Sequence, residues 1–245
     1  MSILFVADIH LCRQRPDLTS AFIQFLDNTA KTCESLYLLG DIFEAWIGDD
    51  YIDPHMQSVV HALRRLSKVG VKLFFQHGNR DFLVGQDFAS LIGAELLAEI
   101  EIVDFGKTKA LIMHGDQLCT DDTDYQNFRS MVRSAQWQKK FLDQSIAQRL
   151  VIADQLRSAS QEKNQLKSAQ ITDVNQDAVE RCMRDNNIKL LIHGHTHRPA
   201  VHQFDSRGRA LTRMVLGDWG QSLWYIQCTT SGCELIERNI RKVSS

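Results

Sequence analysis

Ile3-Leu4-Phe5-Val6-Ala7-Asp8-Ile9-His10 opens the chain as a short apolar run that ends in a carboxylate and an imidazole. A run of this length and apolar content is typical of a strand buried on both faces. Four later runs have the same form, and each also ends in polar side chains: 35–41, 71–79, 109–116 and 189–195. Apolar residues at helical spacing separate the first three runs. Strand alternating with helix predicts an α/β layered fold.

The whole-chain composition excludes several classes of protein. The 245 residues are 44% hydrophobic with a formal net charge of −2, so they can bury a core as one large domain or one domain with an insertion. No basic leader precedes the first apolar run, and no stretch approaches the roughly 18 apolar residues that a membrane span needs. Six cysteines occur without a CxxC pair, so we expect reduced cytosolic thiols.

Residues 126–170 differ from the rest of the chain. They lack Gly and Pro, which predicts helices, and we interpret them as a helical insertion between two core strands. They hold eight basic and three acidic side chains, which gives this segment a formal net charge of +5 and the rest of the chain one of −7. A basic, apolar-striped insertion suits an anionic lipid and an anionic membrane surface, but a solvated helix would have the same composition. The segment contains no motif that reads nucleic acid, so we expect no nucleic-acid partner.

Seven side chains stand where the apolar runs end. Loops after the carboxyl ends of strands in an open α/β sheet converge, so these side chains could share one crevice. All are nitrogen or oxygen donors of the kind that suits Mn²⁺, Fe or Zn²⁺. Seven ligands exceed what one metal takes from protein, which favours a two-metal site with Asp41 as the bridge. The predicted ligands are Asp8, His10, Asp41, Asn79, His114, His195 and His197.

Each motif taken alone has an ordinary explanation. Asp8-Ile9-His10 occurs by chance, Gly40-Asp41 is a common turn, and Asn79 could cap a helix. Gly194-His195-Thr196-His197 is stronger, because two histidines at i and i+2 after a strand form a chelating arrangement. The order of all these motifs along the chain carries the metal hypothesis.

That order, D-x-H, G-D, G-N, H-G-D and G-H-T-H, resembles the calcineurin-like metallophosphoesterase family. The resemblance implies a four-layer α/β fold of two packed mixed sheets flanked by helices, here with a helical cap insertion. It also implies two Mn²⁺ per chain, or other divalent metals. Asp8, His10, Asp41 and His197 would bind one metal. The other would be bound by Asp41, Asn79, His114 and His195.

One position departs from the family pattern. Most members carry His after the Asn, whereas this chain has Arg80, which can clamp phosphate oxygens but cannot act as a general acid near neutral pH. Together with Asp41–Asp50 (DIFEAWIGDD), this resembles a subfamily that hydrolyses the pyrophosphate bond of an acylated UDP-sugar, UDP-2,3-diacylglucosamine, in lipid A biosynthesis. The products would be 2,3-diacylglucosamine 1-phosphate and UMP.

The subfamily resemblance also implies residue roles. Asp41, Arg80 and His195 would be catalytic. Three of the implied substrate contacts, Ser160, Asn164 and Lys167, fall at i, i+4 and i+7 of one helix face. Ser160 and Asn164 could instead be simply solvent-exposed. A further implied contact, Asp122, could instead cap a helix. The expected substrate-binding residues are Asn79, Arg80, Asp122, Ser160, Asn164, Lys167 and His195.

We expect a core formed by residues 1–120 and 186–245, and a cap formed by residues 121–185. The expected partners are the acylated UDP-sugar and the cytoplasmic face of the inner membrane, to which a monomer would bind peripherally. Two rival functions remain open: another binuclear phosphoesterase, such as a nucleotide pyrophosphatase or a cyclic-nucleotide phosphodiesterase, and an inactive scaffold of the same fold.

Overall fold

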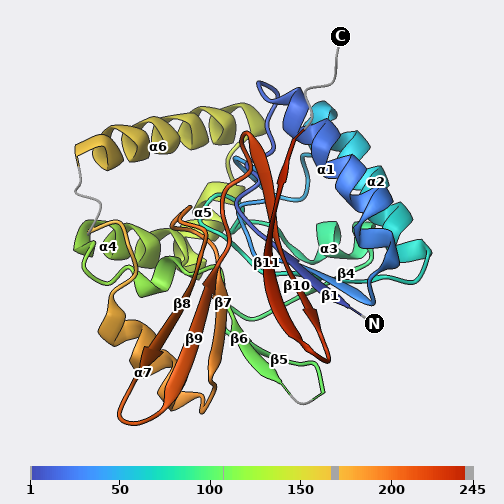
Figure 1. Ribbon diagram of the computed structural model, residues 1–245. Helices are drawn as coiled ribbons and strands as arrows, with labels where there is room; N and C mark the ends of the chain where they lie inside the picture. The colour runs from blue at the N-terminus through green and yellow to red at the C-terminus, as the bar shows by residue number, and fades with distance from the viewer. Residues whose placement is uncertain (1, 107, 167–170, 241–245) are drawn as a thin grey trace.

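The computed structural model describes residues 2–106, 108–166 and 171–240, with only the backbone for 160–166. Two β-sheets lie side by side at the centre, as Figure 1 shows. The six-stranded sheet has the order β11-β10-β1-β2-β3-β4, and the five-stranded sheet has the order β5-β6-β7-β9-β8. Both sheets are mixed, as expected from the sequence.

The six-stranded sheet joins four parallel strands to an antiparallel hairpin. The strands are β1 (Ile3–Val6), β2 (Ser35–Leu38), β3 (Lys72–Phe75), β4 (Ala94–Leu96), β10 (Ser222–Thr229) and β11 (Gly232–Asn239). Its helices are α1 (Pro16–Asn28), α2 (Gln57–Lys68) and α3 (Gln86–Ile92), with short 3-10 turns at Ala30–Thr32 and Pro54–Met56. Their apolar stripes, such as Phe22 on α1 and Leu63 on α2, are buried in one core with Leu36 and Phe75 of the sheet. The spacing of those apolar residues is what places the helices on this face.

The five-stranded sheet forms the other half of the molecule. Its strands are β5 (Glu101–Asp104), β6 (Lys109–Ile112), β7 (Leu190–His193), β8 (Ala200–Asp205) and β9 (Ala210–Val215). A second core between the sheets contains Phe5, Ile112 and Ile192. Helix α7 (Gln176–Asp185) covers the outer face of this sheet through Val179 and Met183. The layers follow one another as helices, six-stranded sheet, five-stranded sheet and helix. This order confirms the expected four-layer fold.

In the described part of the chain, four α-helices lie between β6 and β7 in the sequence, and three of them precede α7. These three follow a short 3-10 turn at Asp116–Leu118 and are α4 (Thr123–Val132), α5 (Ala135–Leu142) and α6 (Ile146–Leu166). Figure 1 shows α6 at the upper left, standing apart from the sheets. Arg149 fixes its first turns, because this side chain is 2% exposed, donates to Ile47 O at 2.7 Å and pairs with Asp50.

The cysteines depart from expectation at one point. Cys228 and Cys233 are joined by a disulfide, whereas the sequence predicted six reduced thiols. The two residues face each other directly in the β10–β11 hairpin, with Cα atoms 4.1 Å apart. Strand register brings them together, and a count of cysteines cannot show register. Among the described residues, no helix has the length and apolar character required to cross a membrane.

Candidate metal centre

The predicted ligands gather where the central strands end. Asp8 and His10 follow β1, Asp41 follows β2, Asn79 follows β3, His114 follows β6, and His195 and His197 follow β7. Five of these residues have a backbone φ between +53° and +68°, a region that residues other than glycine seldom adopt. They are Asp8, His10, Asp41, His195 and His197. Strained backbone of this kind clusters at functional sites.

One group of ligand atoms belongs to Asp8, His10 and His197, whose side-chain donors lie within 4.8 Å of one another. The Nε2 atoms of His10 and His197 are 3.3 Å apart, and Asp8 Oδ1 lies 3.5 Å from His197 Nε2. Three donors from two strand ends thus face one small volume.

A second group lies beside the first and is formed by Asp8, Asp41 and His114. Asn79 Oδ1 lies 3.0 Å from His114 Nε2 and 2.9 Å from His195 Nδ1, which brings those two side chains into the group. Asp41 faces both groups, because its Oδ2 lies 3.9 Å from His10 Nε2 and its Oδ1 lies 3.8 Å from His114 Nε2. The structure therefore brings all seven predicted ligand residues together.

The donor set fits divalent cations. Asp8 is fully buried, and its Oδ1 accepts no hydrogen bond from any described residue. A buried carboxylate oxygen without a donor is costly unless a cation satisfies it. Imidazole, carboxylate and amide oxygen, without a thiolate, suit a first-row divalent metal rather than a structural zinc.

Neighbours outside the ligand set fix the orientation of two imidazoles. His114 Nδ1 donates to Leu39 O at 2.9 Å, and His10 Nδ1 donates to Glu44 Oε2 at 3.0 Å. The Nε2 atom of each ring is then directed into the centre as a lone-pair donor. The sequence did not lead us to predict a role for Glu44, although its position three residues after the predicted ligand Asp41 places it close to the centre.

The electrostatics of the centre are those of an acidic site. Burial lowers the pKa of His10, but Glu44, Asp41 and Asp8 outweigh it and raise that pKa to about 9. Burial and the nearby His114 lower the pKa of His195 to about 4, so this ring is held neutral as a ligand must be. The negative electrostatic potential that favours a proton on His10 also favours a metal cation at this site.

Two glycines and a buried carboxylate hold the loops in place. A Cβ on Gly78 would lie 2.1 Å from Asp41 Oδ1, and one on Gly194 would lie 2.2 Å from Asp8 Oδ2. Asp81 accepts backbone N–H groups of Asp41 at 3.1 Å and Gly78 at 2.9 Å. Burial and Asp41 raise the pKa of Asp81. This carboxylate therefore joins the loops after β2 and β3.

A second buried carboxylate connects the centre to α4. Asp116 Oδ2 accepts from Tyr125 Oη at 2.8 Å and Arg129 Nε at 2.7 Å. Burial raises the pKa of Asp116, but His114 and Arg129 outweigh it and hold that pKa well below its usual range. The Tyr125 ring stacks on His195 with centroids 5.7 Å apart. Nothing in the sequence pattern signalled these contacts of Tyr125 and Arg129.

The predicted substrate residues have different placements. The backbone N–H of Arg80 donates to Asp41 Oδ1 at 2.8 Å, and its side chain lines a cavity beside the centre. Asp122 is buried and caps α4 by accepting Tyr125 N at 3.1 Å. Ser160 and Asn164 belong to α6, where only the backbone is described, and Lys167 lies outside the described residues.

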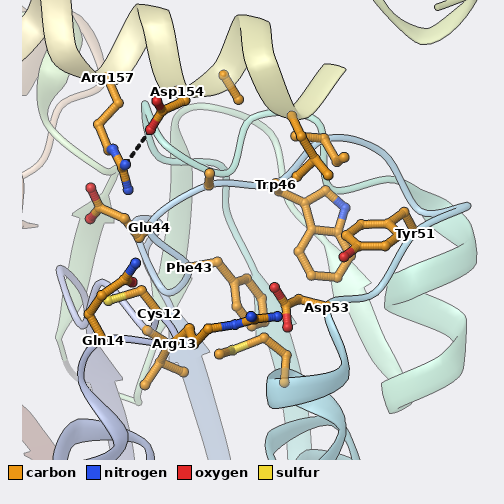
Figure 2. Close-up of a pocket in the computed structure, with 16 residues that line it drawn as sticks. Cys12, Arg13, Gln14, Phe43, Glu44, Trp46, Tyr51, Asp53, Asp154 and Arg157 are labelled. Carbon is orange, nitrogen blue, oxygen red and sulfur yellow. Dashed lines mark hydrogen bonds and ion pairs between the residues drawn. The ribbon is translucent and has the colours of Figure 1, made fainter. Parts of the chain in front are cut away.

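Two cavities adjoin the centre, and both lie under α6. The larger, of about 360 Å³, is lined by residues that follow His10 and Asp41 and is drawn in Figure 2. The smaller, of about 70 Å³, is lined by Asn79, Arg80 and apolar side chains of α4, α5 and α6. Both share a wall formed by Glu44–Trp46 and by Ala153 and Arg157.

Comparison with known proteins identifies related chains. The model of the family described as calcineurin-like phosphoesterase matches residues 1–199. A UDP-2,3-diacylglucosamine hydrolase of Chromohalobacter salexigens is 49% identical over 219 residues, or 89% of each chain. Proteins of the same name from Tolumonas auensis and Serratia proteamaculans are 45% and 46% identical over at least 97% of each chain. The similarity to these relatives therefore includes the helical insertion.

Proposed function

This chain belongs to the calcineurin-like phosphoesterase family, and we propose that it hydrolyses the pyrophosphate bond of UDP-2,3-diacylglucosamine in lipid A biosynthesis. The products are 2,3-diacylglucosamine 1-phosphate and UMP. The observation that carries the proposal is the 41–49% identity, over nearly the whole chain, to hydrolases named for this substrate. An acidic, two-group ligand centre beside an apolar cavity supplies the chemistry such a substrate requires.

The seven strand-end residues would hold two divalent metal ions. Their imidazole and oxygen donors suit Mn²⁺, Fe or Zn²⁺, and Mn²⁺ is the ion that we propose. One ion would be held by Asp8, His10 and His197, and the other by Asn79, His114 and His195. Asp41, which faces both groups, would contribute to both. Such a pair of cations polarises the phosphoryl oxygens and lowers the pKa of an attacking water. The chain then needs no protein base for that water.

Arg80 takes the place of the imidazole that most family members carry. Its guanidinium stays charged and can donate two parallel hydrogen bonds to phosphoryl oxygens. Either product of the reaction leaves as a phosphate anion, which requires little protonation. A fixed cation is therefore adequate where a general acid would otherwise be needed.

The smaller cavity suits an acyl chain. Its apolar lining lies immediately beyond Arg80 and Asn79. The core contributes Phe82 and Leu83, and the insertion contributes Phe128, Trp137, Phe141 and Leu156. A volume of about 70 Å³ is smaller than a whole acyl chain, so the cavity as it stands holds at most part of one. Within the expected cap, residues 121–185, we assign α4, α5 and α6 to lipid binding, because α7 packs on the five-stranded sheet. Asp122, Ser160, Asn164 and Lys167 would be further substrate contacts.

The insertion also supports peripheral attachment of a monomer to the cytoplasmic face of the inner membrane. Its helices expose large apolar side chains, among them Leu142, Ile146 and Val151. Lys139 and Lys140 lie on α5 close to them in sequence. Apolar side chains beside cations suit an anionic lipid surface.

The decisive experiment measures UMP release from UDP-2,3-diacylglucosamine with Mn²⁺, beside the deacylated UDP-sugar and a panel of soluble phosphodiesters. We expect rapid hydrolysis of the acylated substrate alone. Equal rates on both UDP-sugars would exclude lipid specificity, and preference for a soluble diester would favour another phosphoesterase. Asp41→Ala provides the inactive control, because it removes the carboxylate that faces both ligand groups.

A further inference from the structure

We propose that the larger cavity binds the nucleoside of the substrate, so that uridine and the acyl chains extend from the metal centre on opposite sides of a partition. This inference rests on the proposed function and adds a binding site to it. The partition consists of Glu44–Trp46 on the core and Ala153 and Arg157 on α6, the residues shared by both cavities. Figure 2 shows Arg157 extending from α6 toward Glu44, with its guanidinium paired to Asp154.

The cavity is lined by residues that lie next to two predicted metal ligands in the sequence. Leu11–Gln14 directly follow His10, and Phe43–Ile47 follow Asp41, and both segments line it. The smaller cavity instead meets the centre at Asn79 and Arg80. A diphosphate held at the ligands therefore has one cavity open to each of its two substituents. Its volume of about 360 Å³ lies in the range of pockets that hold small ligands.

The chemistry of the two cavities differs once the shared partition is set aside. The smaller cavity then has one charged side chain, Arg80, beside Asn79 and Tyr125 among apolar residues. The larger cavity has three charged side chains besides a carboxamide, namely Arg13, Asp53, Asp154 and Gln14. Burying an acyl chain against such groups desolvates them without replacing their hydrogen bonds, which is costly. A nucleoside can supply those hydrogen bonds.

The lining also offers what a uracil ring requires. Figure 2 shows the rings of Trp46 and Tyr51 together on one wall, where a base can stack. The imide edge of uracil presents one N–H between two carbonyl oxygens, and a carboxamide such as Gln14 can both accept and donate along that edge. Carboxylates such as Asp53 accept from ribose hydroxyls.

The test uses the two products as separate probes. Inhibition by UMP and by 2,3-diacylglucosamine 1-phosphate is measured for wild type, for Gln14→Ala and for the matched variant Phe128→Ala in the smaller cavity. Gln14 is exposed, so its replacement leaves the core intact. We expect Gln14→Ala to weaken UMP inhibition about tenfold, the upper range for one lost hydrogen bond, and to leave inhibition by the lipid product unchanged. Phe128→Ala should show the reverse pattern.

A second readout is the contribution of the base. Wild type should be inhibited more strongly by UMP than by ribose 5-phosphate, which lacks the base, and Gln14→Ala should reduce that preference. If Gln14→Ala weakens only the lipid product, the cavity holds an acyl chain and the inference is wrong. Unchanged inhibition by both products would overturn it as well. A wild-type protein that releases no UMP from the acylated substrate would instead refute the proposed function, and UMP titration of the Mn²⁺-loaded protein would still test the cavity.

Discussion

The metal centre and the helical insertion are held in place by different interactions. Backbone groups fix the centre: the Asp81 carboxylate accepts N–H groups from two loops, and two glycines allow those loops to approach closely. Side-chain ion pairs fix the insertion, through Arg149 with Asp50 and Arg129 with Asp116. Replacing Asp81 or either glycine would disturb the loops of the centre directly, whereas each ion pair anchors one helix of the insertion through one side chain. The comparison predicts that single replacements in the insertion change substrate binding and leave the centre intact.

The largest effect is expected inside the centre. Asp8→Asn keeps the shape of the side chain but removes the charge of a fully buried carboxylate. Turnover should fall about a thousandfold, because the lost metal supplies several kcal/mol of transition-state stabilisation. Elemental analysis should show less bound metal, while circular dichroism should show an intact fold. Full metal content with near-normal turnover would contradict the ligand assignment.

A smaller effect is expected one contact away from the centre. Glu44→Gln keeps an oxygen that can accept from His10 Nδ1 but removes the charge. Metal affinity should fall about tenfold to a hundredfold, as is usual when a partner of a ligating imidazole is changed. Titration with Mn²⁺ measures this change, and excess Mn²⁺ should restore turnover. Failure of excess metal to restore turnover would give Glu44 a different role.

The insertion should respond through substrate binding rather than chemistry. Arg149→Ala removes the buried side chain that ties the start of α6 to Ile47 and Asp50. We expect KM for the acylated substrate to rise about tenfold, equivalent to ~1.4 kcal/mol, while kcat and metal content change little. Arg65→Ala is the matched control, because it breaks an exposed ion pair with Asp27 elsewhere. A loss of kcat with unchanged KM would show that the insertion acts on the reacting groups.

The smallest effect concerns the outer surface of the insertion. Val151→Asp replaces a side chain that is 57% exposed, so stability should not change. Cosedimentation with anionic vesicles should fall about threefold to tenfold, because part of one aliphatic side chain no longer enters the lipid. Val201→Asp on β8, where the valine is 50% exposed, should leave vesicle binding unchanged. An equal loss of vesicle binding in both variants would show that the insertion is not the membrane-binding surface.

The sequence predicted the centre better than its surroundings. Apolar runs ending in Asp8, Asp41 and His195 identified the strands and placed their side chains at one edge, because strand direction determines where a run ends. The contacts of Glu44 with His10 and of Tyr125 with Asp116 could not be predicted in this way. They depend on side-chain reach and on how α4 packs, which local periodicity does not encode. The Cys228–Cys233 disulfide likewise depends on hairpin register.

The positive φ angles at five ligand residues carry a thermodynamic consequence. Each such residue costs on the order of 1 kcal/mol, and the surrounding sheets supply that energy when the chain folds. Cation binding to the folded chain alone returns stability by mass action. A divalent cation bound at the centre would therefore raise the free energy of unfolding and slow proteolysis of the chain, in addition to its role in catalysis.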